Sequence, residues 1–90
     1  MSLYFECHIT LDAADYKIAK YIAQQRNMKI SVLKDEGLDG NDKYVFINFR
    51  SGTLQDAILA MDWVMNDLRQ NYIPVLRKKI EVAIVDQKYD

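Results

Sequence analysis

The sequence is poor in cysteine, proline and glycine, and it contains no long hydrophobic run. Cys7 is the only cysteine among the 90 residues, which excludes an internal disulfide and a cysteine-based zinc site. No apolar stretch approaches the ~20 residues that a membrane helix needs, and no signal-peptide pattern is present. The sequence therefore predicts a soluble, cytoplasmic protein without a membrane segment.

An excess of charge of either sign is missing as well. Twelve basic and thirteen acidic side chains leave a formal net charge of −1. Non-specific binding to nucleic acid or to an anionic membrane works through an excess of Lys and Arg, so this balance argues against both. The sequence also has no nucleophilic triad, no glycine-rich phosphate loop and no cluster of metal ligands. We therefore predict neither a cofactor nor a metal site.

Alternation of apolar and polar residues is what the sequence has in abundance, and it is strict over residues 3–11. Side chains of a strand point to opposite faces with a period of two, so this stretch predicts a central strand with one buried face. The expected buried face holds Leu3, Phe5, Cys7, Ile9 and Leu11, and the expected outer face holds Tyr4, Glu6, His8 and Thr10.

Three further segments, residues 29–33, 44–50 and 75–85, are also predicted to be strands. The loop of residues 34–42 carries four carboxylates without the spacing of a calcium loop, and we interpret it as a solvated hairpin connection. The core-facing residues expected on these strands are Ile30, Val32, Val45, Ile47, Phe49, Leu76, Ile80, Val82 and Ile84.

Two segments show helical periodicity. Asp12 can cap a helix over residues 12–25, with Asn27 as a left-handed stop, and Thr53 with Asp56 resembles a capping box before a helix that runs to about residue 71. The first helix is expected to bury Leu11, Ala14, Ile18, Tyr21, Ile22 and Gln25. The second is expected to bury Leu54, Ala57, Ile58, Met61, Val64, Met65 and Leu68.

The order strand–helix–strand–strand–helix–strand predicts a single domain, residues 1–90, of the α+β class. The expected architecture is a ferredoxin-like βαββαβ sandwich, in which two helices cover one face of a four-stranded antiparallel sheet. The first and third strands are then central, the fourth lies beside the first, and the other face of the sheet is open.

The open face is the only place where polar, titratable and aromatic groups converge. Arg77 offers a planar fork for phosphate or carboxylate, Lys79 a point charge and His8 a switchable donor, so the face can recognise anions. The same groups can equally form a solvated ladder of ion pairs between strands. The candidate binding residues are Glu6, His8, Thr10, Arg77, Lys79 and Glu81.

Two resemblances suggest alternative functions for this face. The segment from Asp42 to Phe49 resembles the third-strand octamer of RNA-recognition-motif domains, which implies base stacking on Tyr4, Tyr44 and Phe46. Its departures from that octamer are Asp42, Lys43 and Val45. The element His8-Ile9-Thr10 resembles the His-x-Thr element of two-histidine phosphoesterases, which implies a catalytic role for His8. Those enzymes need two such elements, whereas this chain has one His.

Two segments together resemble a family of small uncharacterised proteins. That family carries a Tyr-Phe-Glu-x-His first strand and an Arg-x-Lys-Ile-Glu last strand followed by an Asp. Here the matching segments are residues 4–10 and residues 77–81, with Asp86 downstream. The resemblance implies no activity, but it makes a shared purpose for the two strands more plausible.

Leu59 and Trp63 fall in the middle of the polar side of the second helix, where their i, i+4 spacing makes them neighbours. A large apolar pair on an outer face suggests a contact with another protein or with a second copy, unless a loop or the tail of the chain covers it. We therefore predict a small, non-catalytic binding or interaction module that self-associates as a homo-oligomer, with RNA binding or phosphoesterase activity as alternatives.

Overall fold

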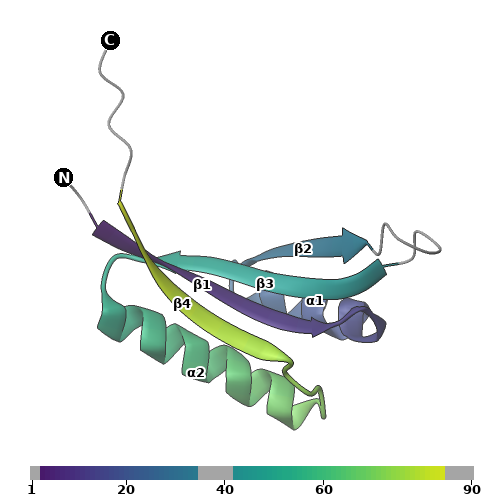
Figure 1. The fold of residues 1–90 in the computed structure, drawn as a ribbon. Helices are drawn as coiled ribbons and strands as arrows, with labels where there is room; N and C mark the ends of the chain where they lie inside the picture. The colour runs from purple at the N-terminus through teal and green to yellow at the C-terminus, as the bar shows by residue number, and fades with distance from the viewer. Residues whose placement is uncertain (1–2, 35–41, 85–90) are drawn as a thin grey trace.

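The computed structural model describes residues 3–34 and 42–84 of the chain, so the predicted loop falls almost wholly outside the described residues. The elements follow the predicted order (Figure 1). They are β1 (Leu3–Asp12), a 3₁₀ turn (Ala13–Asp15), α1 (Tyr16–Gln25), β2 (Lys29–Lys34), β3 (Asp42–Ser51), α2 (Leu54–Gln70) and β4 (Arg77–Ile84).

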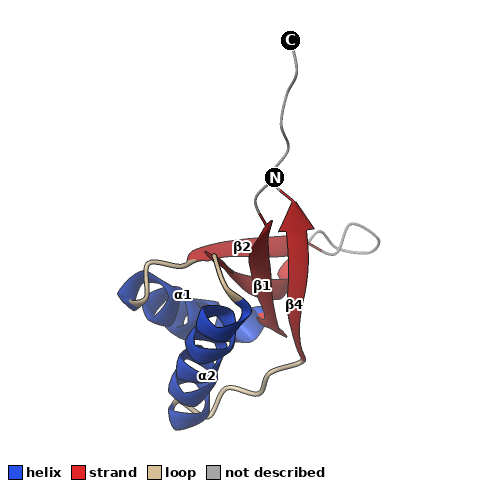
Figure 2. Ribbon diagram, turned by 90° about the vertical axis from the view of Figure 1, so that its left-hand side faces the viewer, coloured by secondary structure: helices blue, strands red, loops and turns tan. Residues whose placement is uncertain are grey.

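The four strands form one antiparallel sheet in the order β2-β3-β1-β4. Both helices lie on the same side of this sheet, and the other side is left open (Figure 2). The predicted ferredoxin-like α+β arrangement is therefore confirmed, with β1 and β3 at the centre. Neither of the helices formed by residues 3–34 and 42–84 has the length and apolar character needed to cross a membrane.

The core lies between the two central strands and the helices. Cys7, Ile9 and Leu11 of β1 are fully buried, as the alternation predicts, and so are Val45 and Ile47 of β3. The prediction is wrong for Leu3 and Val32, which are 57% and 38% exposed because they lie toward the edges of the sheet. Burial also raises the pKa of the Cys7 thiol above its usual value, because the thiolate would lose its hydration. Cys7 thus packs as a small apolar side chain.

The structure confirms both predicted capping residues, Asp12 and Thr53, but α1 begins later than predicted. The Thr53 Oγ1 accepts a hydrogen bond of 3.1 Å from the Asp56 N–H, which confirms the cap of α2. The Asp12 carboxylate likewise accepts one of 2.8 Å from the Ala14 N–H, but it caps the 3₁₀ turn. The α-helix proper begins only at Tyr16.

The predicted buried face of α1 is wrong in part. Its buried residues are Ala19, Ile22 and Ala23, whereas Ile18 is 42% and Tyr21 63% exposed. The prediction followed the larger apolar residues, but alanines face the sheet because their small side chains let the helix backbone lie close to it.

The apolar residues of β4 and of the start of α2 are also less buried than predicted. Val82 and Ile84 are 63% and 55% exposed, and Leu54 and Ile58 are 49% and 45% exposed. Leu76, 53% exposed, precedes the strand instead of belonging to it. The helices cover the centre of the sheet, and β4 lies at its edge beyond them (Figure 2).

Candidate functional site

The strand registers bring the six predicted binding residues together on the open face. His8 lies opposite Lys79, and Thr10 lies opposite Arg77, as the antiparallel pairing of β1 and β4 predicts. Glu6 lies opposite Glu81 in the same ladder. On the other side of β1, the partner of His8 in β3 is Asn48, which was not among the predicted binding residues.

A chain of hydrogen bonds centred on His8 crosses three strands. The Asn48 Nδ2 donates to the Ser31 Oγ of β2 at 2.9 Å, and the Asn48 Oδ1 lies 2.8 Å from the His8 Nδ1 of β1. An amide oxygen only accepts, so this contact places a proton on Nδ1. The His8 Nε2 then faces the Glu6 and Glu81 carboxylates, each at 3.9 Å.

The two carboxylates beside His8 each have a basic partner. The Arg50 guanidinium lies 3.4 Å from Glu6, which also accepts a hydrogen bond of 3.1 Å from the Tyr4 hydroxyl. Lys79 lies 2.7 Å from Glu81. This hydrogen bond from Lys79 is the main cause that holds the pKa of Glu81 below its usual value, and the positive charges nearby act in the same direction. Part of the predicted anion patch is therefore an ion-pair ladder, in which Arg50 and Glu6 join β3 to β1 and Lys79 and Glu81 pair within β4.

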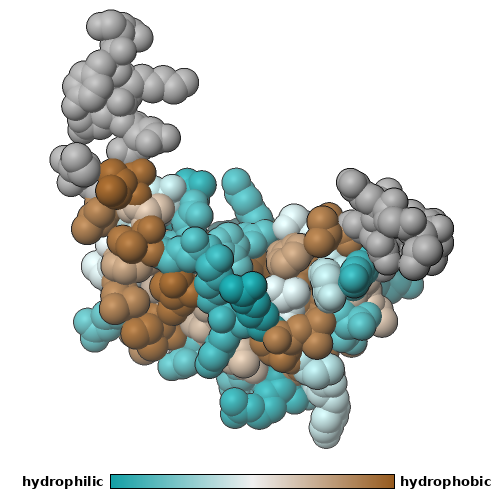
Figure 3. All heavy atoms as spheres, in the orientation of Figure 1, coloured by the Kyte–Doolittle hydropathy of each residue, from teal (hydrophilic) through white to brown (hydrophobic). Residues whose placement is uncertain are grey.

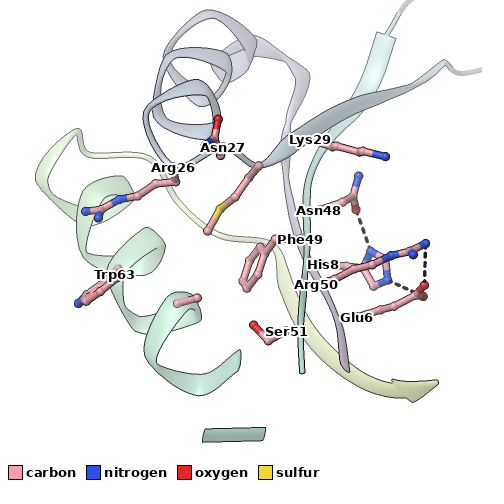
Figure 4. A pocket seen from close by; sticks show the side chains of 12 residues that line it. Glu6, His8, Arg26, Asn27, Lys29, Asn48, Phe49, Arg50, Ser51 and Trp63 are labelled. Carbon is pink, nitrogen blue, oxygen red and sulfur yellow. Dashed lines mark hydrogen bonds and ion pairs between the residues drawn. The ribbon is translucent and has the colours of Figure 1, made fainter. Parts of the chain in front are cut away.

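A groove opens where this ladder meets the edge of the sheet. β3 pairs with β1 as far as Ser51, but β2 begins only at Lys29, opposite Asn48. Within the described residues, β3 therefore has no strand beside residues 49–51 on that side, and a groove of about 560 Å³ lies there (Figure 4). Its lining residues are Glu6, His8, Arg26, Asn27, Met28, Lys29, Asn48, Phe49, Arg50, Ser51, Ala60 and Trp63.

The end of α1 positions one wall of the groove. Asn27 adopts φ 55°, the predicted left-handed stop, and the Met28 N–H donates to the Ala23 carbonyl at 2.8 Å. This reversal turns the chain from α1 directly into β2. As a result, Arg26, Met28 and Lys29 all line the groove.

The two rims of the groove differ in chemistry. On the helical rim, Arg26 lies over the Trp63 ring at 5.3 Å and is held by Asp67 of α2, with nitrogen–oxygen distances of 3.0 and 3.4 Å. On the sheet rim, Figure 4 shows the Arg50 and His8 side chains beside Glu6. The Phe49 side chain lies between the rims, so the groove has an apolar middle and basic groups on both sides.

Sequence reasoning placed Arg50 on the open face without assigning it to the site, and it missed Arg26, Met28 and Lys29. The one available signal was Asn27, because a left-handed stop fixes where the following residues go. Arg77, by contrast, was predicted as an anion fork but does not line the groove.

The three aromatic residues of the RNA-binding alternative do not form one platform. Phe46 and Tyr44 lie opposite Thr10 and Asp12 at one end of β1, whereas Tyr4 pairs with Ala83 at the other end. Eight residues of strand separate Tyr4 from Asp12, which corresponds to about 27 Å.

Leu59 and Trp63 are 49% and 59% exposed on α2, as predicted for an outer face. The Trp63 ring already has an intramolecular partner in Arg26. An interface at these two residues stays a prediction.

Known structures of low sequence identity share this fold. The protein CPII of Thiomonas intermedia K12, solved with ADP, AMP and acetate, is 9% identical over 96% of this chain and 91% of its own, with a TM-score of 0.56. A second CPII structure, with ADP and bicarbonate, is 9% identical over 94% of this chain and 90% of its own, with a TM-score of 0.59. A candidate PII-like signalling protein of Thermus thermophilus is 14% identical over 92% and 90% of the two chains, with a TM-score of 0.52.

These likenesses define the fold of the chain and leave its function open. No protein-family model matches the sequence, and no curated protein matches it.

Proposed function

We propose that the protein is a small, non-catalytic binding module whose groove takes a small anionic ligand with a flat or apolar part. One observation carries this proposal: Arg26, Lys29 and Arg50 line the same groove, and Glu6 is the only acidic residue among the described residues that line it. Asp67 and Glu6 pair with Arg26 and Arg50, and within the described residues Lys29 has no carboxylate partner, so these five groups leave one positive charge in excess. Positive charge in a concave site attracts anions, and guanidinium groups bind phosphate or carboxylate through two parallel hydrogen bonds.

The apolar middle of the groove supports a ligand that is more than a simple ion. Met28, Phe49 and Trp63 lie between or beside the basic groups, and apolar lining with a few placed polar groups is typical of small-molecule sites. Trp63 is 59% exposed, so part of its ring is free to contact a ligand. A nucleoside phosphate has this combination of a flat base and an anionic end.

Two likenesses support the proposal without defining the ligand. The CPII structures contain ADP together with AMP and acetate or with bicarbonate, all of which carry groups of negative charge. The resemblance to the uncharacterised family with Tyr-Phe-Glu-x-His and Arg-x-Lys-Ile-Glu strands includes Glu6 and His8, which line the groove.

The chemistry of the site favours binding over catalysis. His8 is the only imidazole in the chain, and a two-histidine phosphoesterase uses one imidazole for each proton transfer. Its Nδ1 is engaged by Asn48, and its Nε2 faces two carboxylates that already have basic partners. We propose that His8 orients the rim of the groove.

The single tryptophan of the chain provides a direct test. We expect ADP to change the fluorescence of Trp63, because the ring lines the groove. Replacing both Lys29 and Arg50 by Gln should weaken ADP binding by roughly tenfold or more, since each charge-assisted hydrogen bond contributes about 1.5–3 kcal/mol. Bicarbonate and acetate, titrated separately, would tell whether the anionic group alone is enough.

Arg77→Gln is the control for Arg50→Gln, because each removes one arginine charge from the open face and Arg77 does not line the groove. It should leave the affinity for ADP unchanged. The proposal is wrong if neither fluorescence nor amide chemical shifts respond up to about 5 mM ADP, a concentration that reveals even a millimolar site. It is also wrong if Arg77→Gln weakens binding as much as the double variant does.

A further inference from the structure

An apolar strip lies on the helical side of the sheet, at the edge that the helices do not cover, and it has no partner within the described residues. Leu3 lies opposite Ile84, and Phe5 lies opposite Val82, so the start of β1 and the end of β4 form its upper part. Leu54 and Ile58 lie one helical turn apart at the start of α2. Figure 3 shows hydrophobic side chains gathered on this side of the molecule. We call the exposed residues Leu3, Leu54, Ile58, Val82 and Ile84 the β4 strip; each is between 45% and 63% exposed.

The strip borders a hollow between α2 and β4. This hollow has a volume of about 330 Å³. Ile58, Met61 and Ile80 form its apolar part, and the remaining lining residues are Asp62, Lys78 and Lys79. Single apolar side chains scattered over a protein surface are common and do not indicate an interaction. A contiguous apolar patch indicates an interaction site, because association with another molecule removes it from water.

The strip adjoins an edge strand that is protected over only part of its length. Basic side chains on an edge strand prevent it from pairing with another strand, and β4 begins with Arg77, Lys78 and Lys79. From Ile80 to Ile84 the only charged residue is Glu81. The second half of β4 therefore lacks the protection that the first half has.

We infer that β4 pairs antiparallel with β4 of a second copy of this chain, about a two-fold axis perpendicular to the sheet at Ile80. Such an axis keeps both pairs of helices on the same side and joins two four-stranded sheets into one of eight strands. The interface is isologous, so every contact occurs twice. This inference goes beyond anion binding and does not depend on it.

The sequence of β4 is complementary to itself in this register. On the open face, Lys79 of each copy lies opposite Glu81 of the other. Lys79 and Glu81 already pair within each strand at 2.7 Å, so the four groups would form one network of alternating charge around the axis. On the helical face, Ile80 meets its own copy and Leu76 meets Ile84. Lys78 lies opposite Val82, where the aliphatic part of the lysine covers apolar surface.

Neighbouring registers are unfavourable because they oppose like charges. Moving the axis by one residue in one direction puts Lys79 opposite its own copy, and moving it in the other puts Glu81 opposite its own copy. The axis at Ile80 also pairs nearly the whole strand, since β4 runs from Arg77 to Ile84. These features favour a second copy over an unrelated partner.

The test measures the mass of the full chain in solution by light scattering, for wild type, Val82→Lys and Leu59→Lys. We expect a wild-type dimer, a dissociation constant raised roughly tenfold or more by Val82→Lys, which places the new lysine opposite Lys78 of the other copy, and an unchanged dimer for Leu59→Lys. Val82 and Leu59 are both exposed in the single chain, so circular dichroism and thermal unfolding should show that both variants remain folded.

A cysteine at the axis tests the register. Ile80→Cys should form a disulfide between copies on mild oxidation, whereas Val82→Cys should not, because the two thiols introduced at position 82 would lie about 13 Å apart. A chain that stays monomeric at about 0.5 mM overturns the inference. So does a dimer that survives Val82→Lys or breaks with Leu59→Lys, or one that Val82→Cys cross-links in place of Ile80→Cys.

Discussion

β1 and β4 are neighbours in the sheet and alternate alike in sequence, yet they end in different environments. Cys7, Ile9 and Leu11 of β1 are completely buried, whereas Val82 and Ile84 of β4 are more than half exposed. Alternation fixes which side chains share a face, because it follows from the strand geometry. It does not fix what covers that face.

How much of the sheet is buried depends on how far the two helices extend across it. The buried residues of α2 are Ala57, Met61, Val64 and Leu68, which form a narrow stripe. Leu54 and Ile58 flank that stripe and remain exposed beside β4. Two helices therefore cover the central strands and leave the edge strand with an apolar surface that a second copy can bury.

The largest expected difference between the two strands is in stability. Ile9→Ala should lower the free energy of unfolding by about 2–5 kcal/mol, because it leaves a cavity in a fully buried site. Val82→Ala should change it by no more than about 0.5 kcal/mol in the monomer, since its side chain is already in water. Urea unfolding at low micromolar protein concentration measures both. Equal losses for the two variants would mean that β4 is as well covered as β1.

Chemical reactivity should separate the strands as well. In a Val82→Cys variant, the new thiol on β4 and the native thiol of Cys7 on β1 can be followed together with a thiol reagent. Cys7 should react at least about 100-fold more slowly, because a local opening that costs ~3 kcal/mol already gives that factor. The raised pKa of the Cys7 thiol acts in the same direction, since the thiolate is the reactive form.

The rates should be compared at the lowest protein concentration that the assay allows, so that pairing of β4 does not shield the introduced thiol. Wild type, with Cys7 alone, identifies the slow reaction. Two thiols that react at similar rates would contradict the burial of β1.

The sequence was sufficient to predict the sheet order and the residues of the open face, because alternation and two helix caps indicate the element order βαββαβ, which is typical of a ferredoxin-like sheet. It placed His8 and Thr10 near Arg77 and Lys79 on this face, and the structure adds the register of the individual pairs. It could not predict the groove, which depends on where β2 begins relative to β3 and on the chain reversal at Asn27. The offset between the start of β2 and the end of β3 depends on both strands and on the turn at Asn27, so no single segment of the sequence predicts it.

The exposure of the β4 strip could not be predicted from the sequence for a similar reason. Helical periodicity correctly assigned Leu54 and Ile58 to the same side of α2 as Met61, but it could not show that they stay exposed. Whether that face meets the sheet at a given turn depends on how the helix axis crosses the strands, and no single side chain encodes this crossing.

The smallest expected effect concerns the ion-pair ladder on the open face, which links β1 and β4 through His8, Lys79 and Glu81. The pKa of Glu81 is lowered in the folded protein, chiefly by the hydrogen bond from Lys79. A carboxyl whose pKa falls on folding stabilises the folded state above its unfolded pKa, and this contribution is lost as the pH falls through the folded pKa. Lys79→Met should therefore move the pKa of Glu81 back up toward its usual value and remove this acid-sensitive contribution.

Carboxyl carbon chemical shifts measured against pH report the change. The control is Lys78→Met, on the helical face of the same strand, which should leave the pKa of Glu81 unchanged. An unchanged pKa in Lys79→Met would mean that Lys79 does not hold the Glu81 carboxylate, and that the ladder on the open face does not stabilise β4 against β1.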